Sequence, residues 1–147
     1  MRRSGIRIAL GLFILLALGG VSLSMHTRDR EAVAFQSDFY AARKEAAANH
    51  KMMLVDFSAG WCSACDYMKQ NIWSDRHVAD ALGGYVPVTV DVDAHPDLAK
   101  QYQVSELPTT MVIDPTTGAV VRGLEGSPET GQDFIAWLNT PSSRPAD

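Results

Sequence analysis

The segment that most constrains this chain is "KMMLVDFSA", residues 51–59, a nearly continuous apolar run of strand length. A strand with one solvated face alternates apolar and polar residues, whereas this run stays apolar at consecutive positions. Such a run is typical of a strand that is buried on both faces of a sheet, in a fold whose helices cover both sides. Asp56 is therefore expected inside a buried strand.

The rest of the chain supplies strands and helices in an order that predicts a mixed sheet. Strands that alternate with helices pair in parallel, and a hairpin of the last two strands adds antiparallel pairs. The predicted fold class is α/β, with a mixed central β-sheet flanked by helices. Further strands are expected at 33–35, 85–93, 111–114 and 119–124. Helices are expected at 38–49, 62–72, 76–82, 95–104 and 129–139, with Ser37 and Ser127 as the caps of the first and last.

The first 24 residues differ from the remainder. Three arginines precede an apolar run at residues 8–18, and a small-x-small sequence at 22–24 follows. This pattern predicts a secretory signal peptide over residues 1–24. Extended to Leu23, the run has 16 residues, slightly fewer than the roughly 17–25 of a membrane-spanning helix. A retained N-terminal membrane anchor and a buried helix of the domain are the alternatives.

The remaining chain is expected to contain one domain. Residues 25–32 are polar and are predicted to form a linker, residues 33–139 the folded domain, and residues 140–147 a disordered tail. The basic N-terminus predicts that the domain lies on the non-cytoplasmic side of a membrane. The formal net charge is −4, and no basic run follows the N-terminal segment, so nucleic acid is not an expected partner.

The chain has two cysteines, Cys62 and Cys65, separated by two small residues. A bridge at this spacing closes almost no loop, so it stabilises a fold little. Cys62 is expected where a strand gives way to a helix, and the unpaired N–H groups there lower the pKa of a thiol. Cys65 shares a helix face with it and is suited to attack a mixed disulfide formed at Cys62.

Two other interpretations of the cysteine pair are weaker. A structural zinc site needs about four ligands, and the four histidines show no paired ligand spacing, so no metal is predicted. Two unreactive cysteines in a core are common, but Cys-x-x-Cys in a β-α-β context favours dithiol redox chemistry. No cofactor is expected other than the redox-active disulfide Cys62–Cys65.

The sequence "LVDFSAGWCSAC", followed by a strand, a helix and "ELPTTMVID", resembles the thioredoxin superfamily. The resemblance runs from about Val33 to Leu138 and implies a thioredoxin fold. Within the superfamily, "DFSAGWCSACDYMKQNIWSDRHV" is most similar to the C-terminal periplasmic domain of the transmembrane disulfide reductase DsbD. This similarity implies the bacterial periplasm as the compartment.

The resemblance also implies roles for individual residues. Cys62 matches the attacking cysteine and Cys65 the resolving one. Pro108 matches the cis-proline, whose loop lies beside the disulfide and receives substrate, and Leu107 and Trp61 complete the predicted substrate-binding residues. From the residues alone, an ordinary trans proline is the alternative for Pro108, and Trp61 lies either beside the site or in the core.

Asp56 is the third predicted catalytic residue. Burial raises the pKa of a carboxyl group, and strongly perturbed groups cluster at working sites. The resemblance implies an acid that handles protons for the resolving thiol, and the alternative is a solvated aspartate at a strand end. Thioredoxins place a lysine on the next strand near this acid, whereas the motif alignment places Thr89 there.

Together these features predict an exported thiol–disulfide oxidoreductase that acts through Cys62-Ser63-Ala64-Cys65. Strong oxidants of this fold stabilise their thiolate heavily, and Ser63 and Ala64 carry no charge, which favours a disulfide reductase or electron relay. The expected partners are protein thiol and disulfide clients, with a membrane thiol reductase as a candidate electron donor. A disulfide oxidase or isomerase and a non-catalytic client-binding module are the alternatives.

Overall fold

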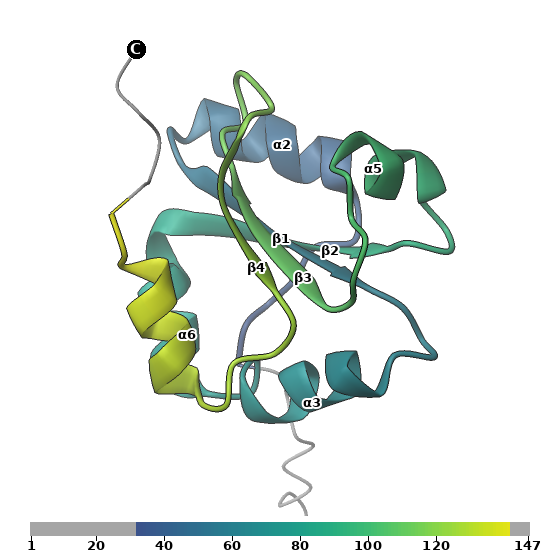
Figure 1. The fold of residues 1–147 in the computed structure, drawn as a ribbon. Helices are drawn as coiled ribbons and strands as arrows, with labels where there is room; N and C mark the ends of the chain where they lie inside the picture. The colour runs from purple at the N-terminus through teal and green to yellow at the C-terminus, as the bar shows by residue number, and fades with distance from the viewer. Residues whose placement is uncertain (1–31, 142–147) are drawn as a thin grey trace, which may run out of the picture.

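The computed structural model describes residues 32–141, in which four strands form a mixed sheet with the order β2-β1-β3-β4 (Figure 1). The strands are β1 (Met52–Ser58), β2 (Tyr85–Asp91), β3 (Thr109–Ile113) and β4 (Val120–Glu125). β1 pairs in parallel with β2 and antiparallel with β3, and β4 pairs antiparallel with β3. The predicted α/β class and the mixed central sheet are confirmed.

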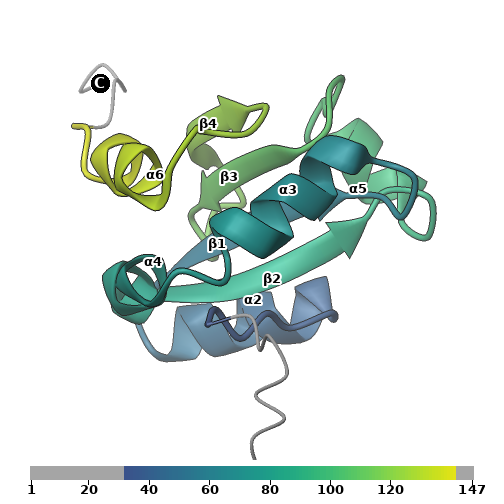
Figure 2. The same cartoon turned by 90° about the horizontal axis from the view of Figure 1, so that it is seen from below.

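Helices cover both faces of this sheet, and Figure 2 shows α2 and α3 on opposite sides of it. The helices are α2 (Phe39–Ala48), α3 (Ser63–Asn71), α4 (Arg76–Ala81), α5 (Pro96–Gln101) and α6 (Gly131–Leu138), with a short 3-10 helix η1 (Leu82–Gly84). Apolar side chains of α2 and α5 pack on one face of the sheet, and those of α3, α4 and α6 pack on the other. This two-sided cover is what a strand as apolar as β1 requires.

The alternation of side chains along β1 decides which face each residue meets. Met53, Val55 and Phe57 lie in the core beneath α2, whereas Leu54 lies in the core beneath α3. Since successive side chains of a strand point to opposite faces, Asp56 points to the α3 side. The five central positions of β1 are all buried, so this carboxyl group lies in the interior, on the same side as the helix that follows the strand.

Helix α2 begins one residue later than predicted. Its N-cap is Asp38, whose Oδ1 accepts hydrogen bonds from the backbone N–H groups of Tyr40 and Ala41, both at 3.0 Å. The prediction of Ser37 as the cap is therefore wrong. A carboxylate also carries the negative charge that a helix N-terminus favours, which a serine hydroxyl does not.

Helix α6 begins at Gly131, and its N-cap is Thr130 rather than the predicted Ser127. Thr130 accepts a hydrogen bond from the backbone N–H of Asp133, and Asp133 accepts one from the backbone N–H of Thr130. This reciprocal capping box satisfies two backbone donors at once. Pro128 suits a first helical turn, and that preference led the sequence-based boundary to start too early.

The predicted strand at residues 33–35 is wrong. In its place, Gln36 forms an isolated parallel bridge with Val88 of β2. The apolar residues of that segment are used for packing instead, because the ring of Phe35 contacts Trp73 edge-on at 5.1 Å between centroids. The segment therefore lies along the β2 edge and closes the core near α3.

The two ends of the chain fall largely outside the described residues. These include the whole predicted signal peptide or anchor at 1–24, residues 25–31 of the predicted linker, and residues 142–147 of the predicted tail. Among the described residues, no helix is long and apolar enough to cross a membrane. The predictions for both ends stay predictions.

Candidate active site

The cysteine pair lies at the junction of β1 and α3, as the sequence predicts. Cys62 is the N-cap of α3, and its Sγ accepts a hydrogen bond from the backbone N–H of Cys65 at 3.1 Å. A disulfide joins Cys62 and Cys65, whose Cα atoms are 5.2 Å apart. An N–H donor at the start of a helix stabilises a thiolate on the sulfur that accepts it. Cys62 therefore has the environment that an attacking thiolate needs.

Both sulfur-bearing residues are sheltered. Cys62 is 7% exposed and Cys65 is 9% exposed, and with Ala59 they form a small apolar cluster. Val92, after β2, and Leu107, before β3, pack against this cluster. The disulfide is therefore held between the start of α3 and two loops at the same end of the sheet.

The loop before β3 contains a cis peptide bond between Leu107 and Pro108. This confirms the cis geometry that the resemblance implied, and the alternative of a trans proline is wrong. The carbonyl oxygen of Pro108 accepts a hydrogen bond from the backbone N–H of Gly126 at 2.8 Å. Gly126 has a φ of +76°, a conformation that glycine adopts readily. The loop is thereby tied to the end of β4 while Leu107 contacts the cysteine cluster.

Trp61 lies on the surface next to Cys62. Its side chain is 70% exposed, so the alternative that places it in the core is wrong. The indole N–H donates a hydrogen bond to Oδ2 of Asp93 at 2.8 Å, which fixes the ring beside a pocket of about 280 Å³. Leu107 and Val104 also line that pocket. The exposed aromatic ring next to Cys62 is therefore accessible to another molecule.

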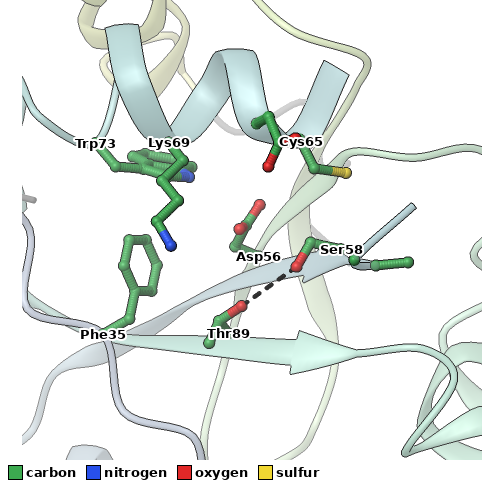
Figure 3. Close-up of a pocket in the computed structure, with 10 residues that line it drawn as sticks. Phe35, Asp56, Ser58, Cys65, Lys69, Trp73 and Thr89 are labelled. Atoms are coloured by element: carbon green, nitrogen blue, oxygen red, sulfur yellow. Dashed lines mark hydrogen bonds between the residues drawn. The ribbon is translucent and has the colours of Figure 1, made fainter. Parts of the chain in front are cut away.

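A second pocket, of about 250 Å³, lies behind Cys65 (Figure 3). Asp56 and Cys65 both line it, and Asp56 is 6% exposed, which confirms the predicted burial and rules out a solvated strand end. Thr89 lies directly opposite Asp56 in the parallel pair of β1 and β2, as the alignment predicts. The hydroxyl groups of Thr89 and Ser58 lie 3.5 Å apart. Cys65 and the buried Asp56 therefore share one cavity.

Comparison with known proteins places this geometry in a family. The family model described as "Thioredoxin-like domain" matches residues 39–141, which is most of the chain. The chain belongs to the thioredoxin-like family. Its domain resembles thioredoxin-2 of Pyricularia oryzae, with 38% identity over 102 residues that cover 68% of this chain and 56% of that protein.

Solved structures agree with the assignment. The oxidised C-terminal domain of DsbD from Neisseria meningitidis superposes with a TM-score of 0.60 at 27% identity, covering 71% of this chain and 97% of that one. A thioredoxin from Thermus thermophilus superposes with a TM-score of 0.64 at 28% identity, covering 73% and 85%. The predicted similarity to the thioredoxin superfamily and to the DsbD domain is confirmed.

Membership of the family supports a general activity for this chain. The chain spans between 36% and 56% of the length of the first three curated relatives. The thioredoxin-like domain and the Cys62–Cys65 disulfide together support thiol–disulfide oxidoreductase activity. The individual roles of Cys62, Cys65, Asp56 and the substrate-binding residues stay predictions.

The places of three polar residues at the site of the thioredoxin-like domain were missed by the sequence analysis. Lys69 of α3 lines the pocket behind Cys65, and its position four residues after Cys65 is a signal that could have found it. Asp93 accepts the Trp61 hydrogen bond, and Ser127 donates one from its hydroxyl to the carbonyl oxygen of Ala64 at 3.0 Å. The last two contacts join segments more than 30 residues apart, and no local pattern reveals them.

Within residues 32–141, no group of three or more His, Cys, Asp or Glu side chains is placed to hold a metal ion. Cys62 and Cys65 are engaged with each other in the disulfide. The arrangement is suited to the exchange of two electrons and two protons between this cysteine pair and a second pair in the opposite oxidation state, one being a dithiol and the other a disulfide.

Proposed function

We propose that this protein is an exported disulfide reductase or electron relay that works by dithiol–disulfide exchange through Cys62 and Cys65. The observation that carries the proposal is the disulfide at the N-terminus of α3, next to the cis Leu107–Pro108 loop. In the reduced protein, the Cys62 thiolate attacks a client disulfide, and one client sulfur leaves as a thiolate that takes a proton from water. A mixed disulfide then joins Cys62 to the other client sulfur.

The second step returns the pair to its oxidised form. Cys65 loses its thiol proton to a nearby base, and its sulfur attacks Cys62 Sγ. The bond between Cys62 and the client breaks, and the second client sulfur leaves with the bonding electron pair. The client has gained two electrons, and the Cys62–Cys65 disulfide has formed. A membrane thiol reductase is the proposed donor that reduces the pair again.

The direction of exchange is argued from the residues between the cysteines. Ser63 and Ala64 are uncharged, so the Cys62 thiolate is stabilised by the helix N-terminus without a neighbouring cation in the motif. A strong oxidant needs a heavily stabilised reduced form, and moderate stabilisation corresponds to a reductant. The resemblance to the C-terminal domain of DsbD supports the same direction.

The compartment is argued from the N-terminus. Residues 1–24 have the basic start, apolar run and small-residue end of an export signal. We propose that the thioredoxin-like domain works in the periplasm, either released after cleavage or held at the membrane by this segment. The expected clients are exported proteins, because disulfides persist in that compartment.

Trapping of the mixed disulfide tests the proposed chemistry. The Cys65→Ser variant keeps the attacking thiol and loses the resolving one, so it is expected to accumulate a mixed disulfide with an oxidised peptide client, detected by mass spectrometry. The Cys62→Ser variant is the matched control and is expected to form none at neutral pH. A client complex that survives reduction and forms equally with Cys62→Ser would instead identify a non-catalytic binding module.

A further inference from the structure

The pocket behind Cys65 is lined by one basic side chain, that of Lys69 on α3. Lys69 lies four residues after Cys65 on α3, so the two side chains emerge from the same helix face. Both line the pocket into which Asp56 points from β1. Figure 3 shows the Lys69 side chain running from α3 into this pocket, with its ammonium nitrogen directed toward the strand side.

The sheet itself offers no charge at the corresponding place. Thr89, the β2 partner of Asp56, is neutral, and so is Thr110, the β3 partner. Other titratable groups that face the pocket are Cys65 and Asp66, both on α3. The N-terminal segment contributes the uncharged ring of Phe35 to the wall. Asp56 is therefore the buried acid of the pocket, and Lys69 contributes the positive charge to its lining.

We propose that Lys69 is a positioning residue for the resolving step, and that its ammonium group balances the negative charge that Asp56 and the Cys65 sulfur carry in turn. The proposal rests on the proposed dithiol exchange. As Cys65 attacks Cys62 Sγ, its thiol proton passes to the Asp56 carboxylate, and the bond from Cys62 to the client breaks. A carboxylate that is out of water accepts this proton only if it starts ionised, and a nearby cation favours the ionised form.

The predicted effect is a displaced pH dependence. With the cation removed, both the Asp56 carboxylate and the Cys65 thiolate become less favourable, so each forms at a higher pH. The Lys69→Met variant is therefore expected to shift the midpoint of the resolving rate upward by about one pH unit. At a pH below that midpoint, the resolving rate of Lys69→Met is expected to be about tenfold lower than that of wild type. Lys69 is exposed and methionine is a comparable helix former, so the fold is expected to survive the change.

The test follows both thiol steps on the full chain with an aromatic disulfide reagent whose released thiolate is coloured. In stopped flow, the first release reports attack by Cys62 and the second release reports resolution by Cys65. The second rate is measured against pH for wild type, Lys69→Met, Lys69→Gln and Lys69→Arg. Lys44→Met is the matched control, because Lys44 is an exposed lysine on α2, across the sheet from the pocket.

The outcomes separate this proposal from the proposed function. The expected result is a shifted second phase in Lys69→Met and Lys69→Gln, recovery in Lys69→Arg, and no change in Lys44→Met. Superposed pH profiles of wild type and Lys69→Met would overturn the role of Lys69 while leaving dithiol exchange intact. A wild-type reaction that shows one release and no second would overturn the exchange itself, and the role of Lys69 with it.

Discussion

Asp56 is the buried acidic residue among the described residues. It is 6% exposed on a central strand, and its carboxyl group enters the cavity that also contains Cys65. Removing a carboxylate from water costs free energy that is only partly recovered from neighbouring groups. The role proposed for this carboxylate is that of a proton acceptor beside the buried Cys65 thiol. The burial that suits Asp56 to this proposed role should also make its charge costly to the fold.

The Asp56→Asn variant is expected to show both effects. Loss of the buried charge should raise the free energy of unfolding at pH 7 by about 1–3 kcal/mol, measured by urea denaturation. Loss of the proton acceptor should slow release of the second thiolate at least about tenfold, measured by stopped flow. Asp66→Asn is the matched control, because Asp66 lines the same pocket but is exposed, and it should show neither effect.

A contrary result would be clear. An Asp56→Asn protein that is less stable than wild type and resolves at the wild-type rate would make Asp56 a structural residue. The stability gain should also vanish at acidic pH, where the wild-type carboxyl group becomes protonated and no longer carries a buried charge. A gain that is independent of pH would point to a packing effect in place of the charge.

For single residues, the sequence predicts a place in the fold where that place is set by neighbouring residues in the chain. Cys62, Cys65 and Asp56 were found because a strand, a turn and a helix follow one another in the motif. The exposure of Trp61 was left open, because its partner Asp93 comes from a distant loop. Lys69 was missed although helical spacing to Cys65 was visible, because charge on a helix is usually solvent-facing.

Among the elements, α3 is the one that creates the site. Its N-cap is the cysteine that is expected to attack, so the hydrogen bond that begins the helix is also the one that stabilises the sulfur. Two contacts from the β4–α6 connection hold this helix: Ser127 donates to the Ala64 carbonyl, and the Tyr67 hydroxyl donates to the Glu129 carbonyl at 2.7 Å. The connection that leads into α6 therefore supports α3.

The cap of α6 gives a prediction at this scale. Thr130→Ala removes one half of the capping box and is expected to lower the free energy of unfolding by about 1 kcal/mol. Urea denaturation with an unchanged m-value would measure it. Because the two bonds are reciprocal, Thr130→Ala and Asp133→Ala should be non-additive in the double variant. Additive losses would mean that the box does not act as a unit.

The sequence predicts the type and order of the elements better than it predicts the residues at which they begin. The type and order of β1, α3, β2 and the final hairpin followed from hydrophobic runs and turn residues. The caps of α2 and α6 were displaced by one and three residues, because Ser37 and Asp38, or Ser127 and Thr130, are each acceptable caps by type. The choice between them is made by hydrogen bonds that form only in the folded chain.

In the whole molecule, the fold brings three distant segments to one end of the sheet. The cysteine pair follows β1, Leu107 and Pro108 precede β3, and Gly126 follows β4 and donates to the Pro108 carbonyl. The order of strands puts β1 next to β3, so the disulfide and the cis-proline loop meet. The sequence predicted this contact only through the resemblance to thioredoxins. Hydrophobic periodicity predicts helices and strands, but it does not predict which distant segments contact each other.

The reduction potential of the Cys62–Cys65 pair tests the central claim most directly. It is measured by equilibrating the purified protein in glutathione or dithiothreitol buffers and quantifying the oxidised fraction. We expect a two-electron transition near or below roughly −220 mV, in the range of thioredoxin and glutaredoxin-like reductants. A value near roughly −120 mV would make the protein an oxidant and contradict the proposed direction. A pair that forms no disulfide at any potential would contradict dithiol–disulfide exchange altogether.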